Sequence, residues 1–192
     1  MIKFFVTFPI FKTKTMKKLT ILLLLTIPFG MLNQHVTAQE VASGDSLRDH
    51  YITAARELMI STRYCALITI DEDGWPSART MDAFEPDSEL TVWFGTKSGT
   101  TKVRQIEQNP ETTLYYYDHE NWGYVALYGK ATIVNDPEAK KRWWKEDWEQ
   151  FYPDGRKDYI LIKFVTEWFR IYSPKHNIEA DPETWRPPEI RL

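Results

Sequence analysis

Six segments of this chain have the length and the alternating apolar pattern of β-strands, and turn-forming residues separate them. The first two, 64–70 and 75–84, flank Asp71-Glu72-Asp73-Gly74, where the glycine suits a hairpin turn with positive φ. The other four are residues 90–95, 112–117, 124–134 and 159–172. A small barrel accommodates six short strands joined by hairpins, because closing the sheet removes its exposed edges. We therefore expect a mostly β fold, a six-stranded antiparallel barrel with inserted helices.

Three helices are expected before and between these strands. The first follows a cap at Asp45 or Ser46, ends near Thr62 and buries one face, formed by Leu47, Tyr51, Ala54, Ala55, Leu58 and Met59. The second covers 98–108 and ends before Asn109-Pro110. The third starts at Pro137 and carries Trp143, Trp144 and Trp148. Residues 174–192 are rich in proline and charge, and we expect them to form a loosely packed C-terminal tail.

Residues 1–38 have the pattern of a secretory signal peptide. Lys17-Lys18 precede the apolar run 19–29, and Val36-Thr37-Ala38 has the small residues of a cleavage site. The run is shorter than the roughly 20 apolar residues that span a bilayer. A buried N-terminal helix is the alternative, although Pro28 and Gly30 disfavour it.

We therefore expect cleavage after Ala38 and an exported mature chain, periplasmic or secreted, without a membrane span after cleavage. Met16 is a second candidate for the translation start, beside Met1. Without the leader the chain has 19 basic and 27 acidic residues, a net charge of −8. Phosphate neutralisation dominates affinity for nucleic acids, so no nucleic-acid partner is expected.

Neither cysteine nor histidine forms a pattern typical of a reactive or metal site. Cys65 is the sole cysteine and lies in an apolar strand, which favours a structural thiol over a reactive one. The four histidines lack the spacing of metal ligands, so no metal site is expected.

Three segments carry residues suited to an anion site. They are Arg79-Thr80-Met81, Trp93-Phe94-Gly95-Thr96 and Lys97-Ser98-Gly99-Thr100-Thr101-Lys102. The last segment opens the second helix, where free backbone N–H groups, hydroxyls and a lysine favour a phosphate dianion. Arg79 can supply a fork-shaped partner from the neighbouring strand.

Simpler structural roles remain open for each of these residues. Lys102 can be a solvated surface charge, and Arg79 can pair with Asp82 or Glu85. Helix caps or core positions would account for the others, Ser98, Thr100, Trp93 and Phe94. The combination and order of the segments favour the phosphate site.

Six motifs follow one another in a specific order. They are Asp-Gly-x-Pro-x-x-Arg-x-Met at 73–81, Trp-Phe-x-Thr at 93–96, Lys102 with Asn109-Pro110, Val-x-x-Tyr-Gly-x-Ala at 125–131, Phe-Tyr-Pro-Asp-Gly at 151–155 and Glu-Trp at 167–168. In this order they resemble the pyridoxamine 5′-phosphate oxidase-like flavin-binding split barrels, most closely the general-stress-protein subgroup. The resemblance covers roughly residues 48–172.

The resemblance implies a six-stranded split barrel over residues 39–173, with FMN in two clefts at the interface of a homodimer. By position, the phosphate would be held by Arg79, Ser98, Thr101 and Lys102. The isoalloxazine would be lined by Thr80, Met81 and the backbone of Trp93, Phe94, Gly95 and Thr96. From the partner subunit, Tyr124 and Trp168 would approach.

The implied function is that of an FMN-dependent oxidoreductase with an unknown small-molecule substrate, acting in a stress response. Pyridoxamine-phosphate oxidases grip their substrate with an Arg-x-His element after the final Trp strand, and Trp168 is not followed by one here. Oxidation of vitamin B6 is therefore not expected. A non-catalytic protein that sequesters flavin or haem is the alternative.

Overall fold

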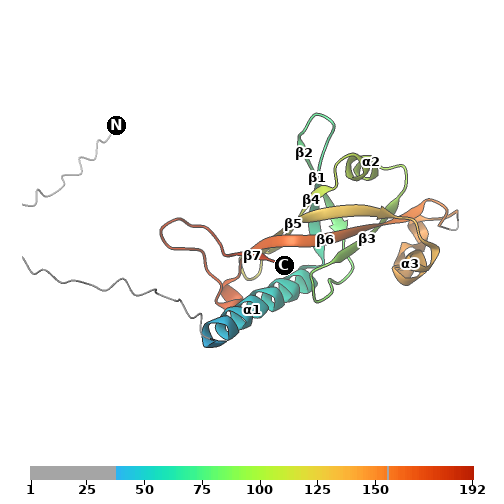
Figure 1. The fold of residues 1–192 in the computed structure, drawn as a ribbon. Helices are drawn as coiled ribbons and strands as arrows, with labels where there is room; N and C mark the ends of the chain where they lie inside the picture. The colour runs from blue at the N-terminus through green and yellow to red at the C-terminus, as the bar shows by residue number, and fades with distance from the viewer. Residues whose placement is uncertain (1–37, 155) are drawn as a thin grey trace, which may run out of the picture. The chain divides into compact units, whose positions relative to one another are not determined.

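The computed structural model describes residues 38–154 and 156–192, which form one unit of strands and helices (Figure 1). The strands are β1 Tyr64–Ile70, β2 Pro76–Asp82, β3 Val92–Lys97, β4 Glu111–Asp118, β5 Gly123–Val134, β6 Tyr159–Tyr172 and β7 Glu189–Arg191. The helices are α1 Ala38–Thr62, α2 Thr101–Gln108 and α3 Pro137–Arg142, with the 3₁₀ helices η1 Glu146–Phe151 and η2 Pro174–His176. None of the helices in this part of the chain is long and apolar enough to cross a membrane. The predicted signal peptide lies outside the described residues, apart from Ala38.

The strands pair in the order β2-β1-β4-β5-β6-β3, all antiparallel, and β7 pairs with β6. Just past the end of β2, Ala83 forms an isolated bridge with Phe94 of β3. Nearby, the Phe84 N–H donates to the Trp93 carbonyl at 2.9 Å. The two edge strands therefore meet at one point and pair nowhere else. This geometry confirms the antiparallel split barrel, with a seventh short strand that was not predicted.

The core lies inside the barrel and under α1. Leu67, Leu114, Leu127 and Phe169 are fully buried there. Cys65 is 3% exposed, and burial raises the pKa of its thiol to about 12. A buried thiol with a raised pKa stays protonated, as the structural role expected from the sequence requires.

Helix α1 is longer than predicted, because it starts at Ala38 and not at Asp45 or Ser46. Its second half buries Ala54 and Leu58 as expected. Leu47 was predicted to face the core, but it is 51% exposed. Residues 44–50 are all exposed, and on this part of α1 it is polar side chains that contact the C-terminal tail, as where Arg48 Nε donates to the Arg191 carbonyl at 3.3 Å.

Two other helices are shorter than predicted. Helix α2 begins at Thr101, because the Ser98 N–H donates to the Asp158 carbonyl at 2.9 Å and Thr100 has an extended backbone. Helix α3 ends at Arg142, and Trp148 belongs to η1. Trp143 is the C-cap residue of α3 and lies outside the helix, where its ring stacks on Trp93 at 5.4 Å between ring centroids.

The C-terminal tail packs against the barrel and is not loose. Ser173 and Ile178 exchange backbone hydrogen bonds of 2.8 and 3.0 Å. The side chains of Ile178 and Ile190 are 3% and 6% exposed. Strand β7 pairs with the section of β6 that β3 does not reach. These two isoleucines stand alone among polar residues, so the sequence has no periodic pattern there.

Candidate functional site

A cavity of about 340 Å³ lies where β2 and β3 diverge. Its lining comes from the end of β2, from β3, from the start of α2 and from η1 with the turn after it: Met81, Asp82, Gly95, Thr96, Lys97, Thr100, Lys102, Trp148, Phe151 and Tyr152. The structure thus brings together parts of all three segments predicted to form an anion site. Met81, Gly95, Thr96 and Lys102 were among the predicted residues.

Lys102 lies in the first turn of α2, and its side chain turns toward β3. Its Nζ donates to Thr96 Oγ1 at 3.1 Å. Burial lowers the pKa of Lys102, and the positive charge of Arg79 lowers it further. The lysine is therefore half-buried beside a second cation, which excludes the solvated surface charge left open by the sequence.

Arg79 reaches from β2 toward α2 and contacts only neutral acceptors. Its Nη1 donates to Thr69 Oγ1 at 2.6 Å, and its Nη2 donates to Ser77 Oγ at 2.8 Å and to Gln105 Oε1 at 2.9 Å. Partial burial lowers the pKa of the guanidinium. No carboxylate pairs with it in the described residues. The positive charge of Arg79 is therefore not cancelled by any carboxylate of residues 38–154 or 156–192.

Asp82 does not pair with Arg79, the alternative that the sequence allowed. It binds Arg63 through two hydrogen bonds of 2.8 Å and Lys145 through one of 2.8 Å. Desolvation opposes ionisation of Asp82, but the hydrogen bonds from Arg63 and Lys145 prevail and lower its pKa to about 2. Asp82 is a fixed carboxylate that ties the η1 segment to β2.

The N-terminus of α2 is left without a side-chain cap. Thr100 is the N-cap residue, but its Oγ1 donates back to the Lys97 carbonyl at 3.0 Å and accepts no helix N–H. The first turn contains no acidic residue. The partial positive charge of the helix end therefore adds to that of Lys102, which suits an anion.

Gly95 allows aromatic rings to approach the strand that lines the cavity. A Cβ at this position would clash with ring atoms of Trp148 and Tyr159. Trp148 is 8% exposed, and its ring meets Tyr159 edge-on at 6.2 Å between centroids. Trp148, Phe151 and Tyr152 therefore form an aromatic wall in the cavity lining. The lining also contains the cations Lys97 and Lys102, but not Arg79. In the part of the chain that the structure describes, no cluster of three His, Cys, Asp or Glu could hold a metal ion.

The family model described as pyridoxamine 5′-phosphate oxidase like matches residues 51–176. The chain belongs to the pyridoxamine 5′-phosphate oxidase-like family. General stress protein 26 of Bacillus subtilis (strain 168) is 36% identical to it over 100 residues, 50% of this chain and 69% of that protein.

Solved structures share the fold of this family member at low sequence identity. A protein related to general stress protein 26 from Clostridium acetobutylicum has a TM-score of 0.63 and 23% identity, covering 75% of this chain and 96% of that chain. A pyridoxamine 5′-phosphate oxidase-related, FMN-binding protein from Nostoc punctiforme has a TM-score of 0.53 and 14% identity, covering 82% and 98%. The fold is thus that of the FMN-binding split barrels.

Two residues predicted to hold the phosphate in this pyridoxamine 5′-phosphate oxidase-like barrel lie just before α2 (Ser98) and at its first position (Thr101). Ser98 and Thr101 are both exposed and line no part of the cavity beside Lys102. Thr101 instead lines a smaller hollow of about 100 Å³ with Arg104 and Gln105. Within the described residues, Arg79 and Lys102 are the predicted phosphate residues that stand close together.

The residues predicted to line a flavin ring differ in burial, and only some of them reach the cavity. Thr80 is exposed and points to the opposite face of β2 from Met81. Phe94 is fully buried in the core, so only its backbone faces the seam between β2 and β3. Trp93 is half-buried against Trp143. Of the four β3 residues predicted, Gly95 and Thr96 line the cavity.

Tyr124 and Trp168, the residues predicted to come from a partner subunit, line no part of their own chain's cavity. They lie on neighbouring strands, β5 and β6, among other aromatic residues. Tyr124 stacks on Tyr115 at 5.6 Å, and Trp168 stacks on Tyr128 at 3.8 Å. Their role in a second copy's site stays a prediction.

Sequence reasoning missed the aromatic wall and the partners of Arg79. Trp148, Phe151 and Tyr152 are visible as a cluster in the sequence, but their approach to β3 follows from the path of the chain after α3. Gln105 lies three positions after Lys102, on the same side of α2, and is 6% exposed. A polar residue on the buried side of a helix was the signal that could have found it.

Proposed function

We propose that this protein binds FMN in the cavity between β2 and β3 and acts as an FMN-dependent oxidoreductase. One observation carries the proposal: Arg79 and Lys102 are half-buried cations, close enough for one to lower the pKa of the other, and no carboxylate of the described residues pairs with either. A phosphate dianion would relieve their repulsion and accept hydrogen bonds from both. Membership of the family and the FMN-binding relative from Nostoc punctiforme support the choice of FMN.

The residues around the cavity fit such a cofactor chemically. Lys102 and the start of α2 would hold the phosphate, and Arg79, which does not line the cavity but acts on Lys102, would add its charge. Met81 with the aromatic residues of the lining would contact the flavin ring. A bound flavin supplies hydride or single-electron transfer. The chain's own residues bind it, orient it and exclude water from one side.

The ionisable residues of the cavity do not form an obvious acid–base pair. Asp82 is held as a carboxylate with a pKa of about 2, and burial raises the pKa of Tyr152, which keeps it a neutral phenol. Neither is poised to exchange a proton near neutral pH. This favours chemistry carried by the flavin, and it also supports the second candidate, a protein that sequesters flavin or haem.

A homodimer forms part of the proposal. The outward-facing positions of β4, β5 and β6 carry a band of aromatic side chains: Tyr115, Tyr117, Tyr124, Tyr128, Trp168 and Tyr172. Exposed apolar patches of this kind mark interaction surfaces. A second copy on this face would bring its own Tyr124 and Trp168 to the interface, and sedimentation should then give twice the mass of one chain.

Export is the remaining part of the proposal. It is supported by the leader pattern in residues 1–38, and cleavage is expected after Ala38. Mass analysis of the N-terminus of the exported protein tests it. Intact Met1 or Met16 on protein recovered from the cytoplasm would contradict both cleavage and export.

Absorbance spectra of the purified protein, before and after addition of FMN, test the cofactor. We expect FMN to be retained through gel filtration at one per chain and then to be reduced by an added nicotinamide donor. Retention without any turnover, or retention of haem and not of FMN, would favour the sequestering protein. Failure to retain FMN would overturn the proposal.

A further inference from the structure

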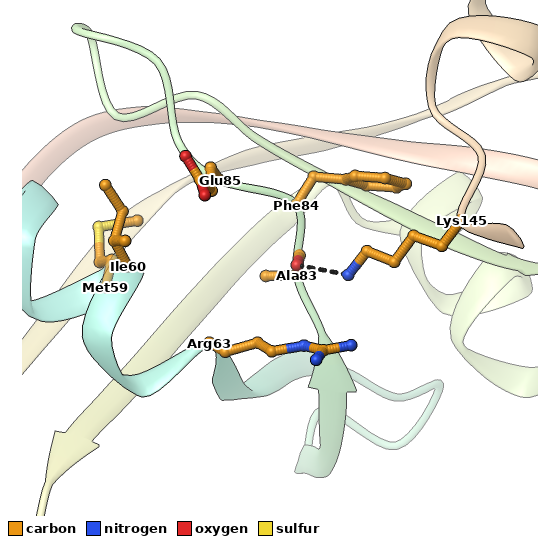
Figure 2. Close-up of a pocket in the computed structure, with 7 residues that line it drawn as sticks. All are labelled: Met59, Ile60, Arg63, Ala83, Phe84, Glu85 and Lys145. Carbon is orange, nitrogen blue, oxygen red and sulfur yellow. Dashed lines mark hydrogen bonds between the residues drawn. The ribbon is translucent and has the colours of Figure 1, made fainter. Parts of the chain in front are cut away.

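A second cavity, of about 380 Å³, lies just past the end of β2 (Figure 2). Its lining combines the end of α1, the residues after β2 and the approach to η1: Met59, Ile60, Arg63, Ala83, Phe84, Glu85 and Lys145. Small-molecule sites have volumes of about 300–1,000 Å³, so this cavity is large enough to hold a ligand. The proposed FMN site makes no use of it.

Part of this cavity is apolar and firmly held. Figure 2 shows Met59 and Ile60 on the helix at one side and Phe84 at the other. The Phe84 ring meets Trp143 and Trp148 edge-on, at 5.1 and 5.4 Å between centroids. Lys145 Nζ lies over the Phe84 ring, 4.7 Å from its centroid, and the ring is only partly buried, so its remaining exposed surface is what a flat apolar group could contact.

The other part of the cavity carries two cations that share one carboxylate. Arg63 binds Asp82 through Nε and Nη2, which leaves its Nη1 without a hydrogen-bond partner in the described residues. Lys145 donates to Asp82 at 2.8 Å and to the Ala83 carbonyl at 2.9 Å, so one of its three N–H donors is unused. Within this hydrogen-bonded cluster two positive charges face the one negative charge of Asp82, and Asp147 also acts on Arg63. The unused donors are therefore what would attract an anion.

Glu85 adds a negative charge to the lining, but it lies apart from these cations. It is exposed, and Figure 2 places it toward Ile60, on the far side of Ala83 from Arg63. Solvent screens the charge of Glu85, as it also screens half-exposed Arg63, so hydrogen bonding and not net charge would select the ligand. The unused donors of Arg63 and Lys145 therefore define the anionic end of a ligand.

The two cavities adjoin at Asp82. Met81 and Asp82 line the proposed FMN cavity, while Ala83 and both cations bound to Asp82 line the second one. A ligand in the second cavity would thus be separated from the proposed FMN cavity by the end of β2 and by the ion pairs of Asp82.

We propose that the second cavity binds a small planar carboxylate, an aromatic acid of one or two fused rings. Its carboxylate would accept hydrogen bonds from Arg63 and Lys145, and its ring would lie against Phe84. Such an acid would be the substrate class of the proposed oxidoreductase. That role rests on the proposed function, whereas binding to the cavity does not.

Titration calorimetry with 2-naphthoate tests the binding, on the full chain with and without FMN, and with 2-naphthamide as the uncharged control. We expect the acid to bind once per chain and the amide to bind about tenfold or more weakly, the scale of a hydrogen bond to a charged group. Lys145→Met and Arg63→Met should each weaken binding of the acid to a similar degree. Each variant leaves Asp82 one cation, and Lys145→Arg should restore most of the affinity.

Lys163→Met serves as the matched control, because Lys163 lies over Trp93 and lines a different hollow. It should leave binding of 2-naphthoate unchanged. Equal affinity for the acid and the amide, no binding of the acid, or wild-type affinity in both Met variants would each overturn the proposal.

The spectrum of bound FMN separates the two proposals. A change in its visible absorbance when 2-naphthoate binds supports the substrate role, and an unchanged spectrum overturns that role. Binding of 2-naphthoate by a chain that does not retain FMN would uphold this cavity and count only against the proposed function.

Discussion

Gln105 Oε1 accepts a hydrogen bond from Arg79 Nη2 at 2.9 Å, and the same oxygen accepts one from Thr69 Oγ1 at 2.7 Å. The amide is therefore fixed in one orientation between a helix and a strand. Because it is neutral, it orients the guanidinium of Arg79 without cancelling its charge. A carboxylate at this position would bind Arg79 equally well and would compete with an incoming phosphate.

Gln105→Glu should therefore weaken FMN binding while the barrel stays folded. The new carboxylate would form an ion pair with Arg79 and remove its charge from the phosphate site. We expect a loss of about 1.5–3 kcal/mol for FMN, the scale of a hydrogen bond to a charged group, and little change for riboflavin, which lacks the phosphate. Titrations followed by flavin fluorescence quenching measure both. Equal losses for the two flavins would contradict a role through Arg79.

Lys102→Ala should weaken FMN binding by a similar amount, about 1.5–3 kcal/mol, because it removes the charge beside Thr96. Riboflavin binding should again be almost indifferent. Added salt should lower the affinity for FMN more than that for riboflavin, since only FMN carries the screened charge. No loss for either flavin would remove Lys102 from the site.

The ion pairs of Asp82 should make stability depend on pH. The folded-state pKa of about 2 lies below the ordinary value of 3.8, so this stabilisation is complete above that value and is lost as pH falls toward 2. Arg63 is half-exposed, and screening limits the contribution to about 1 kcal/mol. Asp82→Asn should lower Tm by about 2–4 °C at pH 7 and by much less near pH 2. The same drop in Tm at pH 7 and at pH 2 would contradict a stabilising role for the ionised form of Asp82.

Gly95→Ala should destabilise the protein and disturb the proposed FMN cavity, since its methyl group would clash with Trp148 and Tyr159. Overpacking of this kind costs about 1–3 kcal/mol. Gly44→Ala is the matched control, because a Cβ there meets no atom within 4 Å and Gly44 lies on the exposed first half of α1, so FMN affinity should be unchanged and stability should not fall. Urea unfolding and FMN titration of both variants provide the comparison. Similar behaviour of the two variants would contradict the packing of Trp148 on β3.

The sequence was informative wherever a local pattern dictates structure. Alternation located six of the strands, and the order of motifs from Asp73 to Trp168 identified the family that residues 51–176 match. The pattern failed at Leu47, which has the spacing of a buried residue but lies on the exposed first half of α1. It also failed in the tail, where Ile178 and Ile190 are isolated apolar anchors without a period.

By itself the sequence determined the strands, the antiparallel barrel and the residue types of an anion site, because these follow from periodicity, turn residues and local charge. Only the tertiary structure decided which positive charges remain available to bind an anion. Asp82 binds Arg63 and Lys145, residues 19 and 63 positions away, and so leaves Arg79 without a carboxylate. Ion pairing depends on distance in space, and strand pairing sets that distance between residues far apart in the chain.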